Sequence, residues 1–158
     1  MKLLFISTLA LALAGQLSQA NVSVQFSDIE SFRDFTVSGS QSVAKSSFTS
    51  ELKRSRLKSY LGSRKLELTF TDIDMAGDTK IARARTGNDI RVIKGVYPPR
   101  LSFNYVLRDS RGNRIKSGSA SLKDTGFDLR MRTGSNLRSF HYELNMLERW
   151  ARRILPKE

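Results

Sequence analysis

The sequence predicts an α+β fold, in which an antiparallel sheet of about five strands carries two helices on one face. Several short stretches alternate apolar and polar residues, which is the period of half-buried strands. Two longer stretches repeat apolar residues every three or four positions, which is the period of amphipathic helices. One strand, one helix, four strands and a terminal helix follow one another, and this order places both helices on the same face of the sheet.

The strands are identified by alternation and by the turn signals that bound them. The clearest alternation lies in residues 101–107, and the sequence DSRGN that follows predicts a hairpin in which Gly112 takes a positive φ. The return strand is rich in Ser, Gly and Ala, so we expect a less buried or edge strand. The five predicted strands are residues 22–26, 66–71, 90–93, 101–107 and 114–122.

Two segments predict helices. Residues 43–61 have helical spacing and end at Gly62, which relieves the left-handed strain at a helix C-terminus. The terminal helix begins after Ser139, a typical N-cap residue, and Glu143 suits the positive end of its dipole. Trp150 lies beside the apolar stripe of this helix and is predicted to be a core residue with no ligand role. The stripe consists of Phe140, Leu144, Leu147, Ala151 and Ile154.

Residues 1–20 have the pattern of a cleaved signal peptide. A basic start at Lys2 precedes an apolar run that is too short to span a bilayer, for which roughly 20 residues are needed. Ser18-Gln19-Ala20 is a small-x-small cleavage signature, so we expect the mature chain to begin at Asn21 and to be periplasmic. A retained membrane anchor is the alternative. Residues 21–158 suffice for one α+β domain with its own core, and we expect no transmembrane segment.

The composition favours an anionic partner. The formal net charge is +12, and the loss of Lys2 lowers it by one, to +11. Nucleic acid, lipid headgroups, cell-wall polymers and acidic proteins all carry the complementary charge. Export argues against nucleic acid, because chromosomal targets lie on the other side of the membrane. A merely solubilising surface is the alternative. The chain contains no Cys, so the fold uses no disulfide.

The stretch TDIDMAGD places three carboxylates in a basic chain. A calcium loop counted from Asp72 would need a bidentate carboxylate at its twelfth position, where this chain has Arg83. The favoured interpretation is a turn, in which Asp side chains cap backbone amides and Gly77 permits a tight reversal. The residues assigned to this structural motif are Asp72, Asp74, Gly77 and Asp78.

Most enzyme classes lack their residues here. A single His, His141, and the absence of Cys exclude multi-His metal sites and thiol catalysis. No Gly-x-Ser-x-Gly elbow and no Gly-rich phosphate loop occurs. We therefore predict no catalytic residue, no metal ligand and no cofactor. The alternative is a carboxylate-dependent hydrolase or metal-binding enzyme centred on Asp72 and Asp74, with Asp124 as a further candidate.

The segments LELTFTDIDMAGD, IRVIKGVYPPRLSFNYVLRD and HYELNMLERW stand in an order and spacing shared with a known family. In these segments the chain resembles the proteobacterial domain-of-unknown-function family numbered three thousand and sixteen. The resemblance covers the whole mature chain and implies a secreted or periplasmic protein. It implies no activity.

We therefore expect a non-enzymatic periplasmic module that binds or scaffolds an anionic envelope component or a protein partner. One candidate surface is the sheet face that the helices leave open. The other is the cationic face of the first predicted helix. Its residues are Lys53, Arg54, Arg56 and Lys58.

Overall fold

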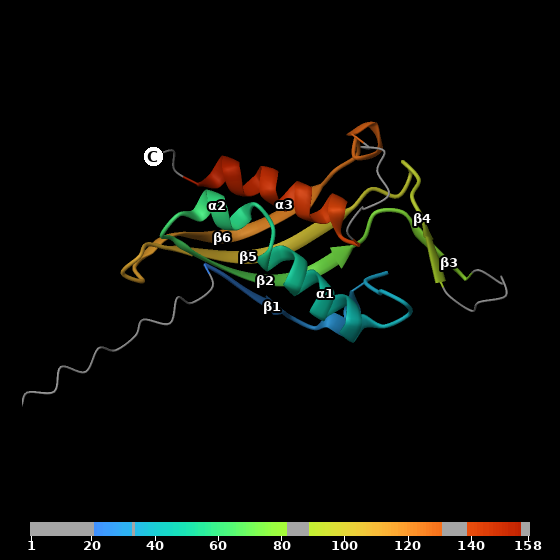
Figure 1. Cartoon of the computed structure of the whole chain (residues 1–158), viewed down its shortest axis with the longest axis horizontal. Helices are drawn as coiled ribbons and strands as arrows, with labels where there is room; N and C mark the ends of the chain where they lie inside the picture. Colours follow the sequence, from blue (N-terminus) through green and yellow to red (C-terminus); the bar gives the residue numbers. More distant parts are fainter. Residues whose placement is uncertain (1–20, 33, 82–88, 131–138, 156–158) are drawn as a thin grey trace, which may run out of the picture.

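The computed structural model describes residues 21–32, 34–81, 89–130 and 139–155. They form an α+β fold, as predicted. A sheet of four strands carries helices on one face, and a separate two-stranded sheet lies at one end (Figure 1). The expected signal peptide, residues 1–20, lies outside the described residues.

The described parts of the chain contain six strands, three α-helices and two short 3-10 helices. The strands are β1 (Val22–Phe26), β2 (Lys65–Asp74), β3 (Asp78–Ile81), β4 (Asp89–Val92), β5 (Arg100–Arg108) and β6 (Arg114–Lys123). The helices are α1 (Gln41–Lys53), α2 (Leu57–Leu61) and α3 (His141–Ile154), with the 3-10 helices η1 (Ile29–Ser31) and η2 (Asp128–Arg130).

The four-stranded sheet is mixed, which corrects the expectation of a wholly antiparallel sheet. Its strand order is β1-β2-β5-β6, and β1 runs parallel to β2, with Val22 opposite Leu66 and Phe26 opposite Phe70. The chain between these two strands passes through α1 and α2, and crossovers of this kind join parallel strands. The pairs β2–β5 and β5–β6 are antiparallel. The predicted strand at 90–93 is β4, which pairs with β3 outside the main sheet.

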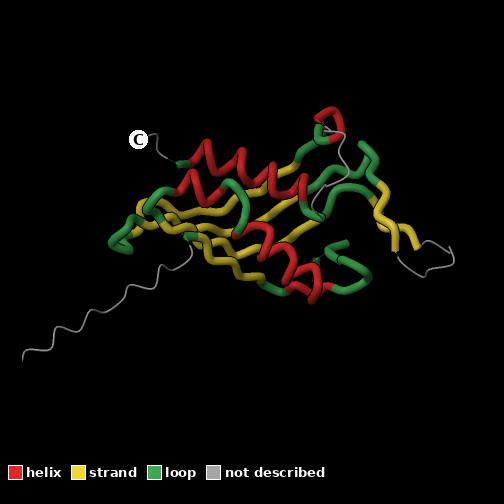
Figure 2. The backbone as a smooth tube through the Cα atoms, in the orientation of Figure 1, coloured by secondary structure: helices red, strands yellow, loops and turns green. Residues whose placement is uncertain are grey.

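The hydrophobic core lies between the helices and the four-stranded sheet. Figure 2 shows the helices gathered on one side of the strands, as the sequence predicts. Phe48 of α1 contacts Phe70 of β2 and Phe140 edge to face, with ring centroids 5.2 and 5.1 Å apart. Leu147 and Trp150 of α3 are both buried, which confirms that they are core residues. The sequence pattern thus identified the face of α3 that packs on the sheet.

The predicted helix over residues 43–61 is two helices in the structure. Ser55 separates them, because its hydroxyl donates a hydrogen bond to the Leu52 carbonyl and accepts one from the Leu57 amide. The expected N-cap of α3, Ser139, is also displaced: Phe140 occupies that position without a side-chain cap. The Phe140 side chain is fully buried in the core. No helix in the described parts of the chain is long and apolar enough to cross a membrane.

The β5–β6 hairpin forms as predicted. Gly112 has a φ of 90°, and the Asp109 carboxylate accepts hydrogen bonds from the Arg111 and Asn113 amides. A hydrogen bond from the Asn113 side chain, with these amide bonds beside it, lowers the pKa of Asp109. Strand β6 lies at one edge of the four-stranded sheet, and most of its side chains are exposed.

Candidate functional site

A basic surface occupies the junction of α1 and α2. Its four predicted cations are exposed, two at the end of α1 and two around the start of α2. Helix α3 lies against the same junction: Glu148 accepts a hydrogen bond from the Arg56 amide at 3.0 Å, and the Arg152 guanidinium lies 5.5 Å from the Tyr60 ring centroid. The basic surface consists of Lys53, Arg54, Arg56 and Lys58, with Arg152 beside it.

The cations of the basic surface have no carboxylate partners within the described parts of the chain. Four other arginines do, and each forms an ion pair with an Asp or Glu. A side chain already in an ion pair contributes little binding energy to an external anion, because its charge is compensated. An exposed cation without a partner can attract such an anion with its full charge. The arginines held in ion pairs are Arg91, Arg100, Arg108 and Arg149.

The stretch TDIDMAGD covers the end of β2, a bend at residues 76–77 and the start of β3. Asp74 is the last residue of β2 and Asp78 the first of β3. The amides of the turn find acceptors elsewhere in the fold: Ala76 donates to Glu143 Oε1 at 2.7 Å, and Gly77 donates to the Tyr97 carbonyl at 3.0 Å. The chain bends here without pairing β2 with β3. A helix carboxylate and a loop carbonyl accept these two amide bonds, where we expected neighbouring Asp side chains.

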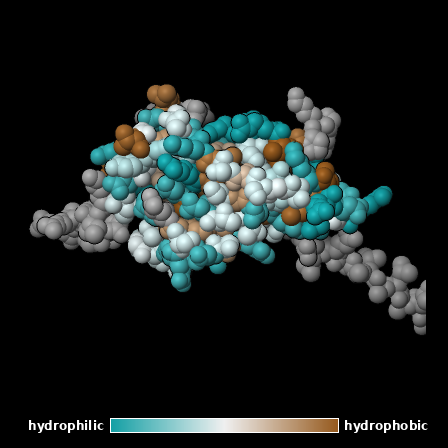
Figure 3. Space-filling view, turned by 180° about the vertical axis from the view of Figure 1, so that it is seen from behind, coloured by the Kyte–Doolittle hydropathy of each residue, from teal (hydrophilic) through white to brown (hydrophobic). Residues whose placement is uncertain are grey.

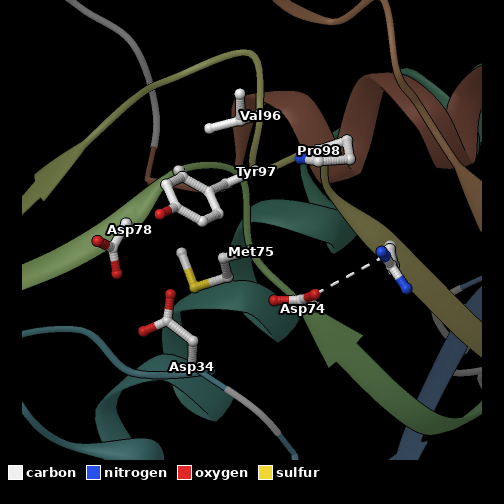
Figure 4. A pocket seen from close by; sticks show the side chains of 9 residues that line it. Asp34, Asp74, Met75, Asp78, Val96, Tyr97 and Pro98 are labelled. Atoms are coloured by element: carbon white, nitrogen blue, oxygen red, sulfur yellow. Dashed lines mark ion pairs between the residues drawn. The ribbon is translucent and has the colours of Figure 1, made fainter.

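A cavity of about 510 Å³ opens beside this turn (Figure 4). Carboxylates reach it from three elements: Asp34 from the loop before α1, Asp74 from β2 and Asp78 from β3. The side chains of Met75 and Tyr97 contribute apolar walls. The structure thus brings two of the three predicted aspartates to one cavity. Asp72 lines a separate hollow with Asp74, and Asp124 lines neither.

Arginines compensate two of the cavity carboxylates. Arg91 Nη1 donates to Asp34 Oδ2 at 2.7 Å, and Thr79 donates to Asp34 Oδ1 at 2.9 Å. Arg100 lies 3.9 Å from the Asp74 carboxylate, the ion pair drawn in Figure 4. Within the described residues, no three His, Asp or Glu side chains are arranged to hold a metal ion. These contacts favour a structural role, in which Asp34 ties its loop to β3 and β4.

Asp124, the further candidate for a carboxylate-dependent enzyme, belongs to another part of the fold. Its carboxylate is nearly buried and pairs with Arg149 of α3. The residue follows β6, and its amide donates to the Pro99 carbonyl at 3.2 Å. The structure therefore does not join Asp124 with Asp72 and Asp74 in one site.

Glu143 is the buried residue that sequence reasoning missed. We assigned it to the helix dipole, but its side chain is buried in the core, where Oε2 has no hydrogen-bond partner among the described residues. The pKa of Glu143 is raised to about 7, mainly because burial desolvates the carboxylate; the Ala76 amide and Arg91 act in the opposite direction, and Glu51 adds to the rise. One signal was available. Glu143 stands three residues after Phe140 and four before Leu147, which places it on the buried stripe of α3.

Gly77 offers a test of the turn. Its φ is 85°, and a Cβ at this position would lie 2.5 Å from the Val92 carbonyl oxygen. We expect Gly77→Ala to lower the free energy of unfolding by about 2 kcal/mol, since it combines backbone strain with a collision. Gly112→Ala is the matched control: φ is 90° there, but an added Cβ meets nothing within 4 Å, so we expect a loss of only about 1 kcal/mol. Urea titration measures both, and equal losses would contradict the tight packing at Gly77.

Comparison with known families and proteins gave one match. A family model described as "Protein of unknown function (DUF3016)" matches residues 20–153. Neither a curated protein nor a solved structure matches the chain. The match covers nearly all of the chain after the expected signal peptide, as the resemblance in the sequence implied.

Proposed function

The chain belongs to the DUF3016 family, and we propose that it is an exported, non-enzymatic module that binds an anionic component of the cell envelope. The basic surface carries this proposal: Lys53, Arg54, Arg56 and Lys58 are exposed together and have no carboxylate partners among the described residues. The alternative, a carboxylate-dependent enzyme, is less favoured, because two of its candidate carboxylates, Asp74 and Asp124, lie in ion pairs.

The chemistry of the basic surface suits phosphate groups. Two lysines and two arginines stand within six positions of the sequence, at a junction that packing against α3 stabilises. Each Lys or Arg close to an anionic surface contributes about 1 kcal/mol to binding at moderate ionic strength. Four such contacts together give an attraction that salt weakens.

Export rests on the pattern of residues 1–20. We expect the protein recovered from a periplasmic extract to begin at Asn21. N-terminal sequencing checks this, and recovery of intact Met1 in the membrane pellet would show that the segment is retained.

Replacing the four cations of the basic surface by Gln tests the binding function. We expect affinity for vesicles that contain phosphatidylglycerol, or for lipopolysaccharide micelles, to fall on the order of a hundred-fold or more at low salt. The matched control removes two lysines and two arginines from the β5–β6 hairpin, all of them exposed. Its four substitutions are Arg111→Gln, Arg114→Gln, Lys116→Gln and Lys123→Gln.

The two quadruple variants have the same net charge, so their difference isolates the position of the charges. Equal losses would mean that net charge alone draws the protein to anions, and would contradict a defined basic surface. Circular dichroism and thermal melting of both variants show that the fold is intact.

A further inference from the structure

Exposed apolar side chains gather at one end of the molecule. Five large hydrophobic residues are exposed within the described parts of the chain, and three of them stand in two loops. Val96 is 76% exposed and Tyr97 45% exposed in the loop between β4 and β5, and Leu129 is 89% exposed in η2 after β6. We call Val96, Tyr97 and Leu129 the apolar tip. The other two, Val43 and Ile115, lie on α1 and β6.

The two loops of the apolar tip touch one another. Gly95 lies so close to the Asp128 carboxylate that an added Cβ would collide with it. Val96 and Leu129 are the next residues along each loop, so both exposed side chains belong to the same end of the molecule. Figure 1 shows the β4–β5 loop above β4 and η2 above the N-terminal end of α3, and two separate hydrophobic groups project at this end in Figure 3.

Buried residues anchor both loops beneath the tip. In the first loop Pro99 is buried, and the Tyr97 amide donates to the Lys94 carbonyl at 3.0 Å. In the second, Phe127 is buried and its ring meets Tyr142 edge to face at 5.0 Å. Anchored loops hold apolar side chains out in water at a cost, because each fails to bury its apolar surface. Single exposed apolar residues are common, but two adjacent anchored loops that both expose them indicate a contact surface.

We propose that the apolar tip inserts into the interfacial region of a lipid bilayer, so that the chain is a peripheral membrane protein. This inference deepens the proposed function, since it names the headgroup layer of a bilayer as the anionic component. Separate projecting side chains enter a fluid lipid layer without needing the flat, complementary partner that a protein interface requires. The Tyr97 ring lines the cavity with Asp34 and Asp78, so Val96 and Leu129 are the side chains that enter the lipid. Lys94, exposed two positions before Val96, suits anionic headgroups.

A double substitution of the tip is the main test. We expect Val96→Ser with Leu129→Ser to lower partitioning into phosphatidylcholine–phosphatidylglycerol vesicles on the order of a hundred-fold, from the loss of two apolar side chains. The matched control is Val43→Ser with Ile115→Ser, which removes two exposed aliphatic residues elsewhere, and we expect its partitioning to stay within about two-fold of the wild type. Flotation of the full mature chain with the vesicles measures both variants.

The absence of Cys permits a second measurement. In otherwise Cys-free protein, Leu129→Cys carrying an environment-sensitive fluorophore should shift its emission to the blue on vesicles. Ile115→Cys with the same label should not. A label at Leu129 that stays in water while the protein is vesicle-bound would overturn the insertion.

The two proposals fail in different ways. If the Gln variant of the basic surface binds vesicles like the wild type while the tip variant does not, the basic surface is wrong and insertion stands. If the tip variant binds like the wild type, insertion is overturned, whatever the basic surface does. A tip variant that only converts a dimer into a monomer in gel filtration, without any wild-type binding to vesicles, would assign the tip to self-association and overturn the proposal.

Discussion

Replacing Trp150 by Ala is expected to lower the free energy of unfolding by about 3–5 kcal/mol. The indole is buried between the sheet and α3, and its ring meets Phe103 at 4.7 Å and Tyr105 at 5.0 Å, both edge to face. Truncation removes these aromatic contacts and leaves a cavity beneath α3, which the surrounding side chains can fill only in part.

Thermal melting of the mature domain measures this effect, and we expect the midpoint to fall by roughly 10 °C or more. Trp150→Phe is the control, because it keeps an aromatic ring at this position, and its midpoint should fall much less. An unchanged midpoint in Trp150→Ala would show that the residue contributes little to the core, and would make it a candidate for ligand binding.

The second large effect is a dependence of stability on pH that arises from Glu143. Its carboxyl group is buried, with one oxygen bonded to the Ala76 amide and the other without a partner among the described residues. Glu51 of α1 disfavours the charged form, and Arg91 of β4 favours it. Desolvation outweighs the favourable contacts and raises the pKa from an ordinary value of 4.5 to about 7.

Because the pKa is raised on folding, the folded protein keeps a proton on Glu143 at pH values where the unfolded chain has already released it. The neutral carboxyl therefore stabilises the fold fully below pH 4.5, and this contribution is lost as the pH rises through about 7. The shift corresponds to roughly 3 kcal/mol between these limits. Urea titrations at pH 5 and pH 8 measure it as a lower free energy of unfolding at the higher pH.

Glu143→Gln should remove most of this dependence, because the amide keeps an oxygen acceptor for Ala76 and does not titrate. Glu148→Gln is the matched control on the same helix. Its carboxylate accepts the Arg56 amide at the surface, so the loss of stability from pH 5 to pH 8 should persist in that variant. If Glu143→Gln shows the same pH dependence as the wild type, another group causes it.

The sequence predicted correctly those helices and strands in which apolar residues recur at a clear helical or strand spacing. The alternation in β2 and β5 identified their buried faces, the stripe of α3 identified Leu147 and Trp150, and the polar return strand identified β6 as an edge. Each of these patterns depends only on which side of one element faces the core. These patterns can therefore be interpreted without knowing which elements pack against them.

Pairing between distant segments was decided by the tertiary structure. Alternation looks the same in parallel and antiparallel strands, so the parallel pairing of β1 with β2 had no local signal. The sequence also did not predict that β3 and β4 form a sheet of their own, because the alternation within a strand does not indicate which other strand it pairs with. The break at Ser55 depends on a side chain that bonds its own backbone, a choice that helical periodicity does not reveal.

Some features of the candidate surfaces were likewise predictable from the sequence, and others depend on tertiary contacts. The basic character of the chain and the cations of the basic surface could be predicted from the residues alone, because net charge and short-range clustering are properties of the chain. The hydrogen bond from the Ala76 amide to Glu143, 67 positions away, and the contact of Gly95 with Asp128 could be found only in the folded chain. Such contacts join segments far apart in the sequence, and packing of the whole core holds them together.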